Sequence, residues 1–233
     1  SEALQLGLKY HRANRLTQAG QFYRQVLSLQ PQNPEALYGL GTLAQQMGQF
    51  QTAEELLSNV VSVQPKLLKA WFSLGNVRQA SGNLPLAESA YKKAIELQPD
   101  AAPLYNNLGY TLQEQAKWDE AIACYQKALE IQPNCIEAEV SLSNALFAQE
   151  KLPQDKQIHY ATANYQLGIT RLKAEDFKGA EAYFRQAIAM QPNLAEAHYN
   201  LAVVLQKQGK FEETVLYCHK TLSLNPNYVE AYN

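Results

Sequence analysis

A proline that recurs every 34 residues constrains this chain more than any other feature. One series of four prolines has this spacing, and a second series of two repeats it after an interruption: Pro31, Pro65, Pro99 and Pro133, then Pro192 and Pro226. A fixed period of this length indicates units that stack on one another in a row. The 233 residues are therefore expected to form an elongated array whose core is built between neighbouring units.

Each period contains two apolar stripes with helical spacing. The window 102–135 shows them most clearly. The first stripe is Tyr105, Leu108, Gly109 and Leu112, and the second is Ala121, Tyr125 and Ala128. Apolar residues at i, i+3, i+4 and i+7 predict an amphipathic helix. Each unit is therefore predicted to be two short helices joined by a tight turn.

The period divides the chain into regular and irregular parts. Four units are expected first, at 1–33, 34–67, 68–101 and 102–135. An irregular unit of one helix plus a linker follows at 136–160, then two units within 161–228 and the start of a truncated unit at 229–233. Because no polar cap is visible at this end, we expect the chain to be a fragment of a longer protein.

The irregular unit lacks the second apolar stripe. A polar stretch interrupted by proline, Lys151–Lys156, follows its helix. The sequence favours a hairpin in which the segment from about Gln157 to Lys173 folds back on helix 137–150 and takes the place of the missing partner. In the alternative, Lys151–Tyr160 is extended, spans about 33 Å and restores a regular array.

Glycines occupy two positions in the repeat. Gly48, Gly82 and Gly209 lie where the first helix of a unit must end, and a left-handed residue is expected there. A second set lies inside first helices, where glycine costs about 1 kcal/mol relative to alanine. This set is Gly41, Gly75 and Gly109. Close helix packing would explain them, and the small residues expected to face them are Ala19, Ala53, Ala87 and Ala121.

These features resemble the tetratricopeptide repeat (TPR) family. The 34-residue helix-turn-helix period, the Leu-Gly pairs, the small residue and the aromatic of the second helix, and the closing proline all match over the chain outside about 136–160. The resemblance implies an all-α solenoid, a right-handed superhelix of antiparallel helix pairs whose first helices line a concave groove. It also implies a scaffold that binds a protein or peptide and has no catalytic activity or cofactor.

Side chains beside the packing stripe of the first helices are the candidate binding residues. Aromatic rings can anchor a partner, and amides can hydrogen-bond to an extended peptide. The predicted groove residues are Tyr38, Phe72, Asn76, Asn106, Asn107, Tyr110, Asn144, Tyr165, Tyr199 and Asn200. A competing interpretation is that some of these aromatics only fill gaps between neighbouring first helices.

The resemblance also leaves a second function open. TPR arrays of O-linked N-acetylglucosamine transferases carry an asparagine column before the Leu-Gly pair. The same column here contains asparagine at Asn107 and Asn200 only. The alternative to a scaffold is therefore the substrate-recruiting arm of a larger enzyme, with its catalytic domain beyond residue 233.

Composition and motifs exclude several classes of function. The net charge is −2, which does not favour nucleic acid, and the apolar runs are too short to span a bilayer. The cysteines Cys124, Cys135 and Cys218 form no metal-spaced or disulfide pattern, which suggests a cytoplasmic protein without a metal site. No catalytic motif appears, and His198 is expected to lie in the core. Self-association through the C-terminal end is a further possibility that the missing cap suggests.

Overall fold

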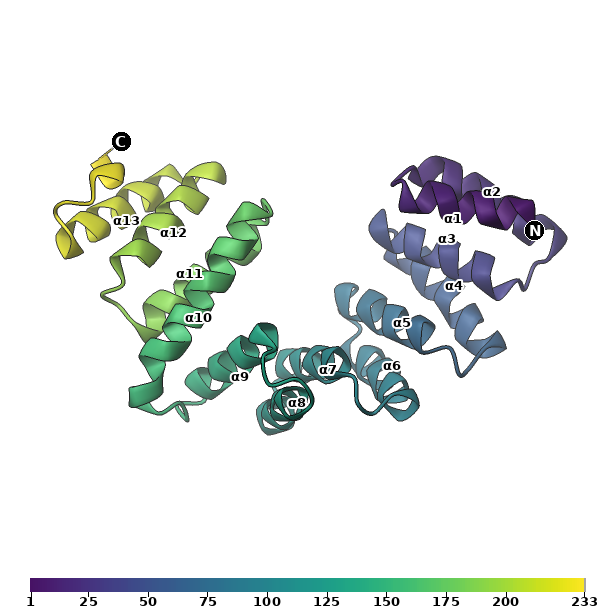
Figure 1. Ribbon diagram of the computed structural model, residues 1–233, viewed down its shortest axis with the longest axis horizontal. Coiled ribbons are helices and arrows are strands. Elements are labelled where there is room, and N and C mark those ends of the chain that lie inside the picture. Colours follow the sequence, from purple (N-terminus) through teal and green to yellow (C-terminus); the bar gives the residue numbers. More distant parts are fainter. Residues whose placement is uncertain (233) are drawn as a thin grey trace. The chain divides into compact units, whose positions relative to one another are not determined.

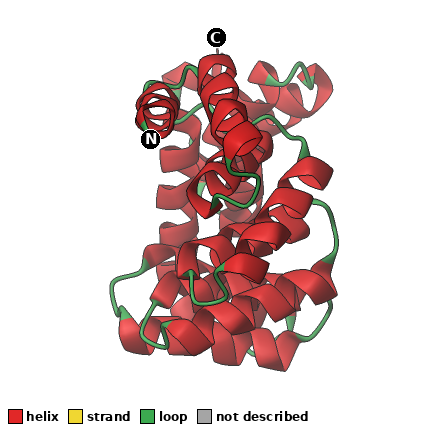
Figure 2. Cartoon of the chain, turned by 90° about the vertical axis from the view of Figure 1, so that its right-hand side faces the viewer, coloured by secondary structure: helices red, strands yellow, loops and turns green. Residues whose placement is uncertain are grey.

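The structure is a computed structural model that describes residues 1–232, without the side chain of Tyr232. The described chain is helical throughout and contains no strand (Figures 1 and 2). It forms two compact units, Ser1–Gln132 and Pro133–Asn233. The predicted start of a further repeat at 229–233 is a short 3-10 helix, η1 (Val229–Tyr232), and Asn233 lies outside the described residues.

The first unit contains four helix pairs. In chain order its helices are α1 (Glu2–Arg12), α2 (Leu16–Leu29), α3 (Pro34–Gln46), α4 (Phe50–Val63), α5 (Leu68–Ala80), α6 (Leu84–Leu97), α7 (Ala102–Glu114) and α8 (Trp118–Ile131). Each odd-numbered helix packs most extensively on the helix that follows it, and each pair then contacts the next pair. Buried side chains fill the space within and between pairs. The predicted all-α fold of stacked helix pairs is confirmed.

The second unit begins with a single helix and continues with two pairs. Its helices are α9 (Ile136–Ala148), α10 (Gln154–Lys173), α11 (Phe177–Met190), α12 (Ala195–Lys207) and α13 (Phe211–Leu224). Helix α10 pairs with α11, and α12 pairs with α13. In these two pairs α10 and α12 take the role that the odd-numbered helices have in the first unit. We call α1, α3, α5, α7, α9, α10 and α12 the first helices.

Every first helix is followed by a turn in which one residue adopts the left-handed conformation. The predicted glycines Gly48, Gly82 and Gly209 have φ values of 71°, 79° and 75°. Non-glycine residues adopt this conformation in the other four turns: Asn14, Ala116, Glu150 and Glu175. The amide of the next residue closes the turn, as where Asn83 N–H donates to Arg78 O over 2.8 Å. Because α9 ends in this turn too, it resembles the other first helices, although no second helix of its own follows it.

The linker after α9 is shorter than the sequence predicts. Helix α10 begins at Gln154, so 154–160 is helical and the assignment of Lys151–Lys156 as linker is wrong at its C-terminal end. Pro153 acts as the N-terminal boundary residue of α10, a place where its missing N–H and fixed φ are tolerated. The resulting helix has 20 residues, compared with 13 in α12.

The N-terminal half of α10 contacts α9, but the hairpin prediction is wrong in giving this segment the place of the missing partner of α9, because α10 pairs with α11. The alternative of an extended Lys151–Tyr160 is also wrong, since α10 begins at Gln154. Asn164 Nδ2 donates to Asn144 Oδ1 over 3.1 Å, and His159 Nε2 lies 2.8 Å from Glu139 Oε1. Val140 of α9 packs in one cluster with Ala163 and Leu167. The C-terminal half of α10 packs on α11. One long helix therefore contacts α9 and also serves as the first helix of the next pair.

The mid-helix glycines face large side chains rather than alanines: Gly41 faces Leu57, and Gly75 and Gly109 face aromatic rings. A Cβ added at Gly75 would lie 2.6 Å from Tyr91 Cε1, and one at Gly109 would lie 2.6 Å from Tyr125 Cε1. Gly168 has the same relation to Phe184. The expected alanine partners, such as Ala87, are wrong: the aromatic of the second helix lies directly on the glycine. Tyr91, Tyr125 and Phe184 are fully buried, so the missing Cβ makes room for the largest fully buried side chain of each of these pairs.

Gly75→Ala should destabilise the first unit, because the neighbouring ring is fully packed and cannot move aside. We expect overpacking to cost about 1–3 kcal/mol, which exceeds the gain in helix propensity of about 1 kcal/mol. The matched control is Gly20→Ala in α2, where the nearest atoms would be 3.7 Å away. This control should raise the melting temperature. Equal effects of the two substitutions in thermal unfolding would contradict the packing argument.

A partly buried carboxylate joins consecutive repeats on the second helices. Glu88 Oε2 accepts from Lys117 Nζ at 2.8 Å and from Gln115 Nε2 at 3.0 Å, both in the turn of the next repeat. In the second unit, Glu181 forms the same contact with Lys210, also at 2.8 Å. Burial opposes ionisation of Glu88, but the hydrogen bonds from Lys117, Lys92 and Gln115 outweigh it and lower its pKa to about 2. We call each of these contacts an inter-repeat clamp.

The clamp predicts a specific loss of stability in acid. The lowered pKa means that Glu88 stabilises the folded state above its ordinary pKa of 4.5, and this contribution disappears as the pH falls toward 2. Glu88→Gln should lower the free energy of unfolding at neutral pH by about 2 kcal/mol and flatten its pH dependence in this window. Glu55→Gln, at an exposed position of α4, is the control. Denaturant titrations at several pH values that are identical for the two variants would disprove the clamp.

Candidate protein-binding surface

The ten predicted groove residues all lie on first helices. Six belong to the first unit, on α3, α5 and α7: Tyr38, Phe72, Asn76, Asn106, Asn107 and Tyr110. Four belong to the second unit, on α9, α10 and α12: Asn144, Tyr165, Tyr199 and Asn200. The side chains are partly exposed, and Tyr110 is 46% exposed. We call the surface made by the six residues of the first unit the first-helix face.

Hydrogen bonds connect neighbouring first helices across this face. Tyr38 Oη lies 3.3 Å from Ser73 Oγ, which joins α3 to α5. Asn107 Nδ2 donates to Asn76 Oδ1 over 3.3 Å and joins α7 to α5. The hydroxyl of Tyr91 also lies 2.7 Å from Asn76 Oδ1. Asn76 and Asn107 therefore hold the framework of the face together, in addition to any contact with a partner.

Neighbouring side chains contact two aromatic residues of the first-helix face, Phe72 and Tyr38. Phe72 lies against Tyr91, with ring centroids 6.3 Å apart and planes inclined by 57°. The ammonium group of Lys69 lies 4.4 Å from the centre of the Tyr38 ring, a cation–π contact. Rings that are already fixed lose little conformational entropy on binding. Both aromatics thus serve the packing and remain available as partly exposed anchors.

One acceptor atom of the Asn106 side chain makes no hydrogen bond. Its Oδ1 atom is buried and has no partner among the described residues. Buried acceptors of this kind are uncommon and call for a water or a ligand donor. Asn106 is therefore the amide of the first-helix face whose hydrogen bonding is incomplete.

The predicted residues of the second unit also connect first helices. Asn200 Nδ2 donates to Tyr165 Oη over 3.1 Å, joining α12 to α10. Asn144 accepts from Asn164, as described above. Tyr199 lies against Tyr228, with ring centroids 5.0 Å apart. In this unit, Asn144, Asn200 and the Tyr165 hydroxyl are used for internal contacts.

Two other sets of residues on the first helices do not contribute to the binding surface. Leu4 and Val140, which occupy the position of Tyr38 in their repeats, are 5% and 1% exposed and belong to the core. The glutamines Gln79 and Gln113, further along α5 and α7, already make hydrogen bonds within the fold. Gln79 and Gln113 accept hydrogen bonds from the hydroxyls of Tyr91 and Tyr125 at 2.9 and 3.1 Å. Helical spacing in the sequence identifies the face, but it does not show which polar side chains already make hydrogen bonds within the fold.

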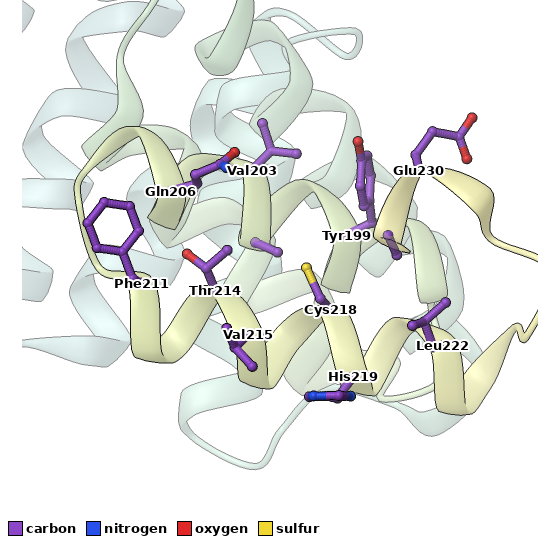
Figure 3. A pocket seen from close by; sticks show the side chains of 12 residues that line it. Tyr199, Val203, Gln206, Phe211, Thr214, Val215, Cys218, His219, Leu222 and Glu230 are labelled. Atoms are coloured by element: carbon purple, nitrogen blue, oxygen red, sulfur yellow. The ribbon is translucent and has the colours of Figure 1, made fainter. Parts of the chain in front are cut away.

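An apolar cleft at the end of the second unit was not predicted from the sequence. This cleft of about 650 Å³ is formed by α12, α13 and η1 (Figure 3). Phe211, Val215 and Leu222 of α13 line it together with Val203 of α12. A comparison of repeats could have revealed it, because Val215 occupies the position of Glu181 in the preceding second helix.

The histidines and cysteines do not assemble a reactive centre in the described part of the chain, where no group of three His, Cys, Asp or Glu residues could hold a metal ion. His198 is buried, as predicted, and its Nε2 lies 2.9 Å from Pro192 O. Trp71 Nε1 makes the same contact with Pro65 O in an earlier repeat, so the two residues have equivalent roles. Burial raises the pKa of the Cys124 thiol to about 11, which keeps it protonated.

The fold defines an all-helical repeat protein. Sequence models described as tetratricopeptide repeat match residues 10–74, 102–135, 161–194 and 195–228, and one described as TPR repeat matches 75–116. The chain belongs to the tetratricopeptide repeat family. No curated protein matches it.

Solved structures with the same fold have low sequence identity. The PilF protein of Pseudomonas aeruginosa has a TM-score of 0.59 at 15% identity, over 99% of this chain and 94% of its own. YrrB, described as a TPR protein with an unusual peptide-binding site, has a TM-score of 0.51 at 16% identity, over 90% and 95%. Cut9, in the APC/C hetero-tetramer Cut9–Hcn1, has a TM-score of 0.52 at 19% identity, over 99% of this chain but 41% of its own.

Among residues 1–232, no helix combines the length and the apolar character of a membrane span.

Two asparagines on neighbouring first helices should respond differently to removal. Asn76→Ala deprives the Tyr91 hydroxyl and the Asn107 amide of their shared acceptor, which should cost about 1–2 kcal/mol. Asn106→Ala removes an acceptor that has no partner, so it should change stability by much less. Urea unfolding of both variants measures the difference. An Asn106→Ala variant as unstable as Asn76→Ala would show that the two amides have equivalent structural roles.

Proposed function

We propose that this protein is a non-catalytic scaffold that binds a protein or peptide segment on its first-helix face. The observation that carries the proposal is the row of partly exposed aromatics on α3, α5 and α7. Tyr38, Phe72 and Tyr110 offer apolar anchors, and Asn106 between them has an unmet acceptor. Aromatic anchors with a few convergent polar groups are typical of protein interfaces.

The rigidity of the framework supports this proposal. The hydrogen bonds between Tyr38 and Ser73 and between Asn76 and Asn107 fix the spacing of α3, α5 and α7. A pre-organised surface loses less conformational entropy when it binds a partner. YrrB, which shares the fold, is itself described as a TPR protein with a peptide-binding site. The three cysteines are free, so we also propose a reducing, cytoplasmic location.

The alternative function, a recruiting arm for a glycosyltransferase, rests on the asparagine column. In the structure Asn107 and Asn200 hydrogen-bond to neighbouring first helices. These side chains are therefore explained by the packing of the array. The column gives no additional support to the enzyme-associated function.

The test uses a peptide selected from a random library for binding to this chain. Changing Tyr38, Phe72 and Tyr110 together to alanine should weaken its binding by about 2 kcal/mol or more, because anchor rings carry most of the interface energy. The matched control changes three exposed apolar residues on second helices of the same unit to alanine: Val63, Leu86 and Leu97. Isothermal titration calorimetry with circular dichroism separates binding from folding. Equal affinity of both triple variants would contradict the proposal.

A further inference from the structure

His198 contacts the turn between α11 and α12 through one of its two ring nitrogens. The ring is 3% exposed, and its Nε2 atom lies 2.9 Å from the carbonyl oxygen of Pro192. Because a carbonyl can only accept, Nε2 carries the proton and donates it. The other nitrogen, Nδ1, is buried and has no hydrogen-bond partner in the part of the chain that the structure describes. A second proton would therefore place a positive charge at a buried atom without an acceptor.

The side chains around His198 do not compensate for such a charge. The ionisable groups that face this region are Tyr217 and Lys220 of α13, Arg185 of α11, Tyr165 of α10 and Glu196 of α12 itself. The Tyr217 ring stacks on the imidazole, with centroids 5.8 Å apart, and the Lys220 ammonium group repels a further positive charge. Glu196 is exposed and lies two positions away, on a different side of the helix.

The equivalent residue of an earlier repeat makes the same contact without titrating. Trp71 lies in the first turn of α5, and its Nε1 donates to Pro65 O over 2.8 Å. Neither α5 nor α12 has a side-chain hydrogen bond at its N-cap, so the bond from ring to carbonyl is a side-chain contact that fixes the turn. An indole N–H only donates, whereas an imidazole can gain a proton near neutral pH. The second unit thus has a titratable group where the first has an inert one.

We propose that His198 is a pH-sensitive switch that keeps the turn between α11 and α12 closed when neutral and opens it when protonated. A charged ring leaves its buried site by opening of the first turn of α12, which exposes Nδ1 to water. Asn200 lies in the same part of α12, so the opening also loosens its hydrogen bond to Tyr165 of α10. Acid therefore weakens the connection between two first helices of the second unit.

The second helices stay connected under the same conditions. Burial opposes ionisation of Glu181, but its hydrogen bonds, first that from Lys210, lower its pKa below the ordinary value of 4.5. The inter-repeat clamp between Glu181 and Lys210 is therefore still charged in weak acid. The opening is a local one at the start of α12, and the pairs α10–α11 and α12–α13 remain joined by the clamp.

The direction of the effect follows from the pKa of His198. Burial lowers this pKa, the hydrogen bond to Pro192 raises it in part, and the charge of Lys220 lowers it further, so that it lies below the ordinary value of 6.5. In the open state the ring is hydrated and binds a proton more readily than in the closed state. Opening therefore becomes easier as the pH falls through 6.5 toward the pKa of the closed state.

Amide exchange followed by NMR at about pH 7.5 and about pH 5 tests the switch, after correction for the intrinsic pH dependence of exchange. The protection of amides 197–202 in α12 should fall severalfold at the lower pH. The equivalent amides 70–75 of α5, where Trp71 makes the matching contact, are the internal control and should keep their protection. Equal changes in the two segments, or no change in α12, would overturn the proposal.

Two substitutions remove the titrating group and keep an aromatic ring. His198→Trp introduces the residue found at this position as Trp71, and His198→Tyr the one found as Tyr105. In either variant, once circular dichroism verifies the fold, the protection of 197–202 should no longer depend on pH. His219→Gln, at an exposed position of α13, should keep the wild-type response.

A folded His198 variant that still loses protection in acid would also overturn the proposal. If neither variant folds, the comparison of α12 with α5 in the wild-type chain decides. Binding of a peptide to the first-helix face is measured in the other unit, so the outcome for His198 leaves that proposal unaffected.

Discussion

The contact between a second-helix aromatic ring and a first-helix glycine determines how most of the helix pairs close. Tyr91 on Gly75, Tyr125 on Gly109 and Phe184 on Gly168 repeat the same geometry in both units. Each ring fills the gap that the absent Cβ leaves, and this allows the two helices to approach closely. The tyrosine hydroxyls then reach the first-helix face, where they meet Asn76, Gln79 and Gln113. One interaction thus closes the pair and also organises the polar groups of the candidate binding surface.

Two other sets of contacts connect each repeat to the next. On the second helices, Glu88 and Glu181 accept hydrogen bonds from the following turn. On the first helices, Tyr38, Asn107 and Asn200 bond to the neighbouring first helix. The clamps involve the second helices, and the amide and tyrosine contacts involve the first helices. Together they fix the spacing of adjacent first helices, on which any extended binding surface depends.

Much of the fold could be predicted from the sequence because the constraints are local. The 34-residue period, the amphipathic stripes and the turn glycines specify the helix pairs and their ends. The partner of the mid-helix glycines could not be predicted, because spacing alone does not say whether Ala87 or Tyr91 enters the gap at Gly75. Pro153 was expected to break a helix, yet it precedes the first turn of α10, where proline is compatible with a helix. For the candidate surface, helical periodicity identified the face. It could not show that Asn76 and Asn107 already bond to each other.

The most direct test of the account is hydrogen–deuterium exchange of the chain with and without its selected peptide. The account predicts slower exchange concentrated in α3, α5 and α7, with much smaller changes in α4 and α6, because the partner contacts the first helices over a pre-formed framework. Protection confined to the second helices would contradict it. So would protection spread uniformly over the first unit, since that would indicate folding on binding rather than recognition by a pre-organised face.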